Sequence, residues 1–176
     1  MRHAEHVALL RDGVTRGGVW ADLGSGEGAF TLALADLLGE EGRIHSIERD
    51  AAALTTQRDA IAKRFPRVAV EFLRADFTKP LDLPPLDGIV MANSLHFYRD
   101  KEELVRRLVG HLKGDGRFVL IEYDADRGNM WVPHPISFAT WEQVAPRAGL
   151  TGTRLLAKVP SRFLGAIYSA LSVRAY

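Results

Sequence analysis

Short apolar runs alternate along the chain with longer segments in which apolar residues recur at helical spacing. The runs predict buried strands, and the longer segments predict helices with one apolar face. The expected strands are residues 19–23, 43–47, 68–73, 88–92, 117–123, 153–159 and 165–173. The expected helices are residues 4–10, 30–38, 51–65, 101–112 and 137–147.

This order of elements predicts an α/β fold with a doubly wound sheet. Strands that alternate with helices form a mostly parallel sheet with helices on both faces. The last two strands are joined only by residues 160–164, which are too few for a parallel crossover. We therefore expect a hairpin there, with one antiparallel strand in the region of the sheet edge.

Several residues at the ends of elements refine this pattern. Asp50 is expected to cap the helix that follows it, and Asp100 with Glu103 resembles a capping box. Residues 78–88 hold three prolines and are expected to form a loop. Residues 124–136 form a second long loop, which we interpret as a lid.

Composition narrows the class of protein. A chain of 176 residues suits a single domain, here residues 1–176 with a short N-terminal helix within residues 1–17. The formal net charge of +1 gives no overall attraction for nucleic acid or an anionic membrane. The sequence contains no cysteine, no secretion signal and no apolar stretch of membrane-spanning length, so we expect a cytoplasmic protein.

The stretch "VWADLGSGEGAF" carries the clearest chemical signal. Gly24, Gly26 and Ala29 satisfy the pattern G-x-G-x-x-G/A directly after a strand, a turn that holds nucleotide cofactors. Glu48 ends the next strand, where a carboxylate can accept both hydroxyls of a ribose. A ribose-bearing cofactor is therefore expected at the carboxyl ends of these strands.

Two carboxylates at the turn indicate which cofactor this is. Asp22 and Glu27 would repel a pyrophosphate, which prefers bare amides and a positive helix end. S-adenosylmethionine has no phosphate, and its sulfonium and ammonium groups are positive. The acids therefore favour S-adenosylmethionine over a dinucleotide.

With these acids, the chain resembles the class I S-adenosylmethionine-dependent methyltransferases in their short single-domain form. The motifs that carry the resemblance are "DLGSGEG", "SIERD", "RADF", "MANSLHF" and "HLKGDGRFVLIE". The resemblance covers about residues 15–175, and it implies a Rossmann-like seven-stranded sheet.

The resemblance also implies cofactor contacts for individual residues, several of which have a plain structural alternative. Asp76 could instead cap the loop that enters Thr78, and Asn93 could instead cap a turn. The implied contacts are Gly24, Ser25 and Gly26 at the methionine part, Asp22 at the ammonium directly or through water, Glu48 at the ribose, Asp76 and Phe77 at the adenine, and the Asn93 carbonyl at the ammonium.

The reaction would be an in-line displacement, which needs a general base only if the acceptor must lose a proton. His96, Tyr123 and His134 are weak candidate bases, because packing in the protein or a position in solvent explains each of them better. No metal-ligand spacing occurs, so no metal is expected.

The methyl acceptor is expected to be a small molecule. The exit of the fourth strand lacks [DNS]-P-P-[YFW], which disfavours a nucleic-acid acceptor. Met130, Trp131 and Pro133 favour a partly apolar acceptor. Two alternatives remain open: a cofactor-binding partner protein without turnover, and an NAD-dependent oxidoreductase domain. The sequence also leaves a homo-oligomer open.

Overall fold

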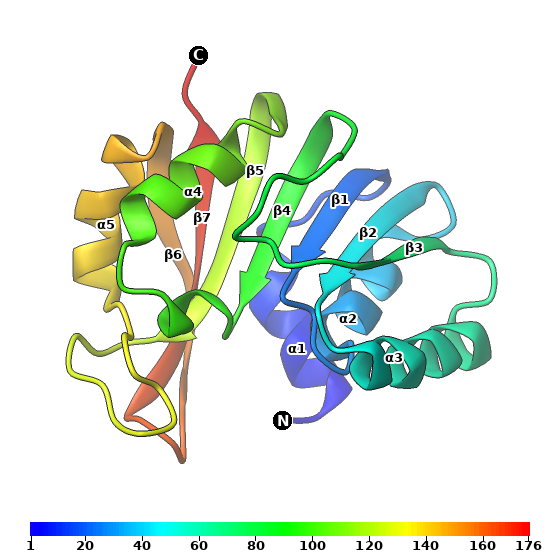
Figure 1. Ribbon diagram of the computed structural model, residues 1–176, viewed down its shortest axis with the longest axis horizontal. Helices are drawn as coiled ribbons and strands as arrows, with labels where there is room; N and C mark the ends of the chain where they lie inside the picture. Colours follow the sequence, from blue (N-terminus) through cyan, green and yellow to red (C-terminus); the bar gives the residue numbers. More distant parts are fainter.

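The computed structural model describes residues 1–176 and contains one seven-stranded sheet with helices on both faces (Figure 1). The strand order is β3-β2-β1-β4-β5-β7-β6. The elements are α1 (His3–Leu10), β1 (Gly18–Leu23), α2 (Ala29–Leu38), β2 (Gly42–Glu48), α3 (Ala51–Arg64), β3 (Ala69–Arg74), β4 (Leu86–Ala92), the 3₁₀ helix η1 (Leu95–Phe97), α4 (Lys101–Val109), β5 (Leu112–Tyr123), α5 (Phe138–Arg147), β6 (Leu150–Pro160) and β7 (Ala166–Arg174).

The strand order creates the place where a ligand can bind. Strands β1 to β5 are parallel, and β1 lies between β2 and β4. The chain runs outward from β1 through β2 to β3, and then returns to the other side of β1 with β4. A crevice forms at such a switch point, beyond the carboxyl ends of β1 and β4.

The predicted seven-stranded, mostly parallel sheet and its terminal hairpin are confirmed. Strand β7 is the antiparallel one, and it pairs with β5 on one side and with β6 on the other. The antiparallel strand therefore lies second from the edge, because β6 occupies the edge itself.

Each face of the sheet has its own apolar core. Phe118 and Leu120 on β5 belong to the core beneath α4 and α5. Val119 and Ile121, the residues that alternate with them, belong to the core beneath α1 and α2. The near-continuous apolar run of β5 follows from this burial on both sides.

The sequence prediction was wrong at the junction of α4 and β5. The helix ends at Val109 rather than Leu112, and β5 begins at Leu112 rather than Arg117. Leu112 pairs with Leu86, and the register then shifts before Arg117 pairs with Gly88. Gly114 and Gly116 lie in that irregular part of β5. In the sequence, this pair of glycines predicts a turn between the helix and the strand. Strand β4 likewise begins inside the predicted loop 78–88.

The two predicted caps have different outcomes. Asp50 accepts hydrogen bonds from the backbone N–H groups of Ala52 and Ala53, as expected. Asp100 makes no side-chain cap bond, so the predicted capping box is wrong. Glu103 instead pairs with Arg106 one turn along the helix. Separately, no helix combines the length and the apolar character needed to cross a membrane.

Candidate functional site

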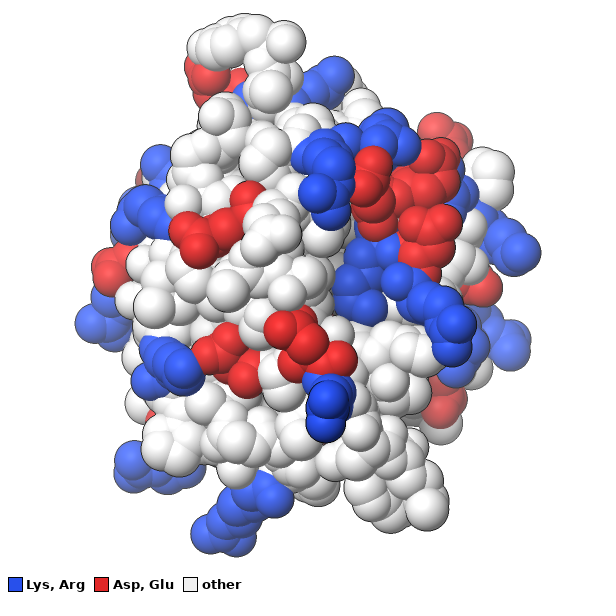
Figure 2. All heavy atoms as spheres, turned by 90° about the vertical axis from the view of Figure 1, so that its left-hand side faces the viewer, with Lys and Arg blue, Asp and Glu red and all other residues white.

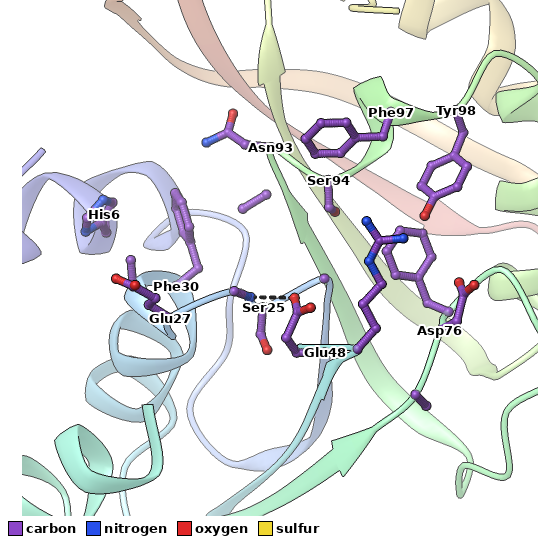
Figure 3. A pocket seen from close by; sticks show the side chains of 17 residues that line it. His6, Ser25, Glu27, Phe30, Glu48, Asp76, Asn93, Ser94, Phe97 and Tyr98 are labelled. Atoms are coloured by element: carbon purple, nitrogen blue, oxygen red, sulfur yellow. Dashed lines mark hydrogen bonds between the residues drawn. The ribbon is translucent and has the colours of Figure 1, made fainter. Parts of the chain in front are cut away.

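A cavity of about 680 Å³ opens at the carboxyl ends of β1 to β4. Its size lies within the range of small-molecule sites. Figure 3 shows Glu48 near its middle, with His6 and Phe30 toward one end and Asp76 and Tyr98 toward the other. The glycine turn and the exit of β4 form the walls between these ends.

The glycine turn follows a path that only glycine permits. Gly24 has φ +75°, and a Cβ on it would lie 2.7 Å from the Cβ of Ser94. Gly28 has φ +89°, and a Cβ there would lie 2.4 Å from the Cβ of Gln57. The turn is therefore packed between the exit of β4 and the helix α3, which fixes the floor of the cavity.

Gln57 holds the turn from below, and sequence reasoning missed it. Its side chain is fully buried on α3, and Nε2 donates to Ser25 Oγ and to the Gly26 carbonyl, both at 2.9 Å. Its Oε1 accepts from Ser46 Oγ at 2.7 Å. The Ser25 hydroxyl, a predicted cofactor contact, is thus already bonded within the protein. A polar residue between Leu54 and Ile61 on the buried face of α3 was the available signal.

Glu48 links the glycine turn to the end of β2. Its Oε2 accepts from the Gly26 N–H at 3.0 Å, the bond drawn in Figure 3, and its Oε1 accepts from the Asp50 N–H at 2.9 Å. Each carboxylate oxygen has two lone pairs, so each retains capacity for a further donor. The side chain lines the cavity, as the ribose prediction requires.

Asp22 lies elsewhere than predicted. It is 1% exposed, it does not line the cavity, and it accepts a 2.7 Å hydrogen bond from Thr31 Oγ1. Burial raises the pKa of Asp22 to about 7, against the opposing effect of the Thr31 bond, and the charge of Glu48 raises it further. This position does not support a direct contact with an ammonium group; the predicted contact through water stays a prediction.

The end of the cavity near β3 combines an acid with aromatic rings. Asp76 Oδ1 accepts from the N–H and the hydroxyl of Thr78, and these bonds lower the pKa of Asp76. The structural alternative for Asp76 is therefore real, yet the residue also lines the cavity. Phe77 packs edge-on against Tyr98 with centroids 5.3 Å apart. Arg49 and Tyr98 complete this end, and the sequence did not predict either.

The exit of β4 presents an unpaired acceptor. Asn93 has φ +52°, lines the cavity, and its side-chain Oδ1 is buried without a hydrogen-bond partner. Such an atom is costly to leave unpaired. Its neighbour Ser94 donates to the Leu23 carbonyl at 2.8 Å, which ties the exit of β4 to the end of β1.

The three candidate bases have different surroundings. His96 is buried, and its Nδ1 lies 3.0 Å from Oε2 of the fully buried Glu122. Nε2 of His96 has no partner in the protein. Tyr123 is also buried, packed edge-on against His96. His134 contacts this group only through its backbone N–H, which donates to the His96 carbonyl.

The predicted lid does not cover the cavity in this structure. None of the seventeen residues that line the cavity comes from residues 124–136. Met130 and Trp131 project into solvent, while Val132 of the same loop is buried. The cavity wall is completed instead by His6 of α1 and Phe30 of α2, whose rings lie 4.8 Å apart.

Fold and cavity together define an open α/β protein with a cavity of ligand size at its switch point. Comparison with known families shows that residues 21–118 match the family described as "Methyltransferase domain". This match spans more than half of the sequence. The chain therefore belongs to the methyltransferase domain family.

Curated relatives agree with this family. A ubiquinone/menaquinone biosynthesis C-methyltransferase of Azotobacter vinelandii is 31% identical over 112 residues, which are 63% of this chain and 44% of that protein. A probable cobalt-precorrin-6B C(15)-methyltransferase of Thermoplasma volcanium is 27% identical over 114 residues, 65% of this chain and 55% of that protein. The chain thus spans about half the length of these relatives.

Solved structures confirm the fold. An S-adenosylmethionine-dependent methyltransferase from Aquifex aeolicus has a TM-score of 0.72 at 19% identity, with 99% of this chain and 100% of that chain covered. A 1,6-didemethyltoxoflavin-N1-methyltransferase from Burkholderia thailandensis has a TM-score of 0.79 at 16% identity, with 99% and 78% covered. The family resemblance and the fold expected from it are confirmed, and the oxidoreductase and non-catalytic alternatives are not favoured.

Proposed function

We propose that this chain transfers the methyl group of S-adenosylmethionine to a small-molecule acceptor by in-line displacement. The cofactor supplies a methyl group on a positive sulfur, which leaves as a neutral thioether while the acceptor atom bonds to the carbon. The protein's part is to hold both reactants in line and to exclude water.

The charge of the cavity is the observation that carries this proposal. Three carboxylates line it, those of Glu27, Glu48 and Asp76, against the single guanidinium of Arg49. An excess of negative charge favours a cationic ligand and disfavours a diphosphate.

The geometry supports specific roles for the residues that hold the cofactor. Glu48 would accept from the ribose hydroxyls with lone pairs that its two backbone bonds leave free. Asp76 and Phe77 would meet the adenine at the β3 end of the cavity. The turn from Gly24 to Gly26 would border the methionine part, together with Asn93.

None of the three candidate bases lines the cavity, and His96 is the one whose ring has an orienting partner. A carboxylate on Nδ1 holds a histidine ring in place and favours the tautomer with Nδ1 protonated, which leaves Nε2 able to accept a proton. Glu122 provides this contact at 3.0 Å. Tyr123 and His134 have no comparable orienting partner, so we assign them no step.

A small acceptor is supported by two of the related proteins. One is named for ubiquinone/menaquinone biosynthesis, and the structure of another contains bound 1,6-didemethyltoxoflavin. The acceptor of this chain is a further small molecule of unidentified structure. Cytoplasmic location and a homo-oligomeric state stay predictions.

The test is a calorimetric titration with S-adenosylhomocysteine, using Glu48→Ala and the matched control Glu41→Ala. Glu41 is an exposed acid that pairs with Arg16 away from the cavity. Loss of charge-assisted bonds to the ribose should weaken binding by about 2–5 kcal/mol for Glu48→Ala and leave Glu41→Ala unchanged.

Equal affinity in Glu48→Ala and the wild type would refute the assigned site, provided both melt at the same temperature. Turnover is checked separately by release of S-adenosylhomocysteine with a panel of small acceptors. Cofactor binding without release for any acceptor would favour the non-catalytic alternative.

A further inference from the structure

Two loops beside the cavity expose large apolar side chains that the proposed reaction does not use. Met130 is 87% exposed and Trp131 is 72% exposed in the loop between β5 and α5. Phe163, in the turn between β6 and β7, is 66% exposed. Both loops lie at the lower end of the molecule in Figure 1, the end at which the parallel strands finish.

Asn129 shapes the first loop and joins it to the second by one hydrogen bond. Asn129 Oδ1 accepts from the backbone N–H groups of Trp131 and Val132, at 2.9 and 2.8 Å. Its Nδ2 donates to the Phe163 carbonyl at 3.2 Å. Val132 is buried beneath them. The exposed side chains therefore project from two loops that are joined at Asn129.

The charge around these side chains is positive. Segments 127–134 and 161–165 contain Arg127 and Arg162 and no acidic residue, and neither arginine forms an ion pair. Two acids precede the first segment. Asp124 pairs with Lys158, whereas Asp126 accepts from Ser137 and keeps its negative charge, so the arginines leave a local net charge of only about +1. In Figure 2 the lowest part of the molecule accordingly shows white and blue atoms.

We propose that this apolar and basic surface docks on an anionic lipid bilayer. Met130, Trp131 and Phe163 would enter the interface, and Arg127 and Arg162 would meet lipid phosphates. Tryptophan and phenylalanine next to arginine are the side chains that suit this boundary. The docked face would turn the mouth of the cavity toward the membrane.

The shape of the surface favours a bilayer over a bound small molecule. A ligand groove is concave and covers its apolar lining, whereas these three side chains project and stay mostly exposed. Docking differs from the expectation drawn from the net charge of +1, because the positive charge is local to the two loops. The docking proposal does not depend on methyl transfer.

Intrinsic tryptophan fluorescence can test this proposal. Of the protein's three tryptophans, Trp20 and Trp141 are fully buried, so Trp131 alone can respond to solvent. We expect its emission to shift to the blue, and acrylamide quenching to fall, when vesicles of phosphatidylcholine with phosphatidylglycerol are added. Vesicles of phosphatidylcholine alone should give a much weaker response, and added salt should reduce binding.

Variants separate the two contributions. Met130→Ser with Phe163→Ser should lower partitioning onto the mixed vesicles at least about tenfold. Arg127→Ala with Arg162→Ala should lower it about tenfold or more, and abolish the preference for phosphatidylglycerol. Leu155→Ser is the control, because Leu155 is 44% exposed on β6 outside both loops. Melting temperatures establish that the variants are folded.

Three results would overturn the proposal. The first is Trp131 emission that does not respond to either kind of vesicle. The second is protection of Trp131 that rises with protein concentration without lipid, with a dimer in sedimentation, which would assign the surface to a second copy of the chain. The third is an equal loss of vesicle binding in Leu155→Ser.

Discussion

Two acids beside the same glycine turn lie in different environments in the folded protein. Asp22 and Glu48 look equivalent in sequence, as carboxylates at the ends of neighbouring strands. The structure buries Asp22 against Thr31 and places Glu48 in the cavity. The negative charge at the surface of the cavity therefore comes from the lining acids, while Asp22 is buried beneath them and bonded to Thr31.

The raised pKa of Asp22 predicts a specific pH dependence of stability. Its pKa is about 7 in the folded protein, against a usual value of 3.8. Between these values the unfolded chain loses the proton while the folded protein keeps it. Stability should therefore fall as the pH rises from about 4 to 7, by up to about 1.4 kcal/mol per pH unit from this group.

Asp22→Asn should remove that part of the pH dependence, since the amide does not titrate. The free energy of unfolding is measured by urea denaturation between pH 4 and 8. Above pH 7 the variant should gain stability relative to the wild type. A parallel pH profile for Asp22→Asn and the wild type would contradict the raised pKa, and Asp82→Asn, at an exposed position, is the control.

At the scale of elements, the cavity depends on how α3 docks beneath the glycine turn. Gln57 is the contact between them, and it reaches Ser25 across 32 positions of sequence. The polar side chain of Gln57 can be buried because its amide donates to Ser25 and Gly26 and accepts from Ser46. The turn and the helix thus form one unit.

Gln57→Ala should loosen this unit. The bonds to Ser25 and Gly26 are lost, so we expect a loss of about 1–3 kcal/mol of stability and weaker binding of S-adenosylhomocysteine. Thr56→Ala, at an exposed position on the same helix, should change neither. Unchanged affinity in Gln57→Ala would mean that the turn keeps its shape without this support.

The elements that sequence predicted well are those with a local signal. Buried strands such as β1 follow from apolar runs, and the final hairpin follows from the short connection before β7. The junction at Leu112 failed because an apolar residue there fits both a helix and a strand. Gln57 and the burial of Asp22 could not be predicted, because they depend on contacts between elements distant in sequence.

At the scale of the whole molecule, one sheet joins two cores. Leu120 and Ile121 are neighbours on β5, yet their side chains enter opposite cores. Because the same strand supports both layers, loss of packing on one face should also lower the stability of the core on the other face. The prediction of a single domain over residues 1–176 can be tested on this basis.

Leu120→Ala and Ile121→Ala should each lower stability by about 2–5 kcal/mol, since each leaves a cavity in a fully packed core. Differential scanning calorimetry should show one cooperative transition in the wild type and in both variants, at lower temperature in the variants. Two separate transitions in either variant would show that the cores unfold independently.

The ligand preference of the whole cavity is tested most directly by calorimetry of the wild-type protein. S-adenosylmethionine, S-adenosylhomocysteine and NAD(H) are titrated in turn under identical buffer and salt. A cavity with three carboxylates and one guanidinium predicts binding of both adenosyl compounds and no measurable binding of NAD(H). Tighter binding of NAD(H) than of S-adenosylmethionine would contradict the assignment.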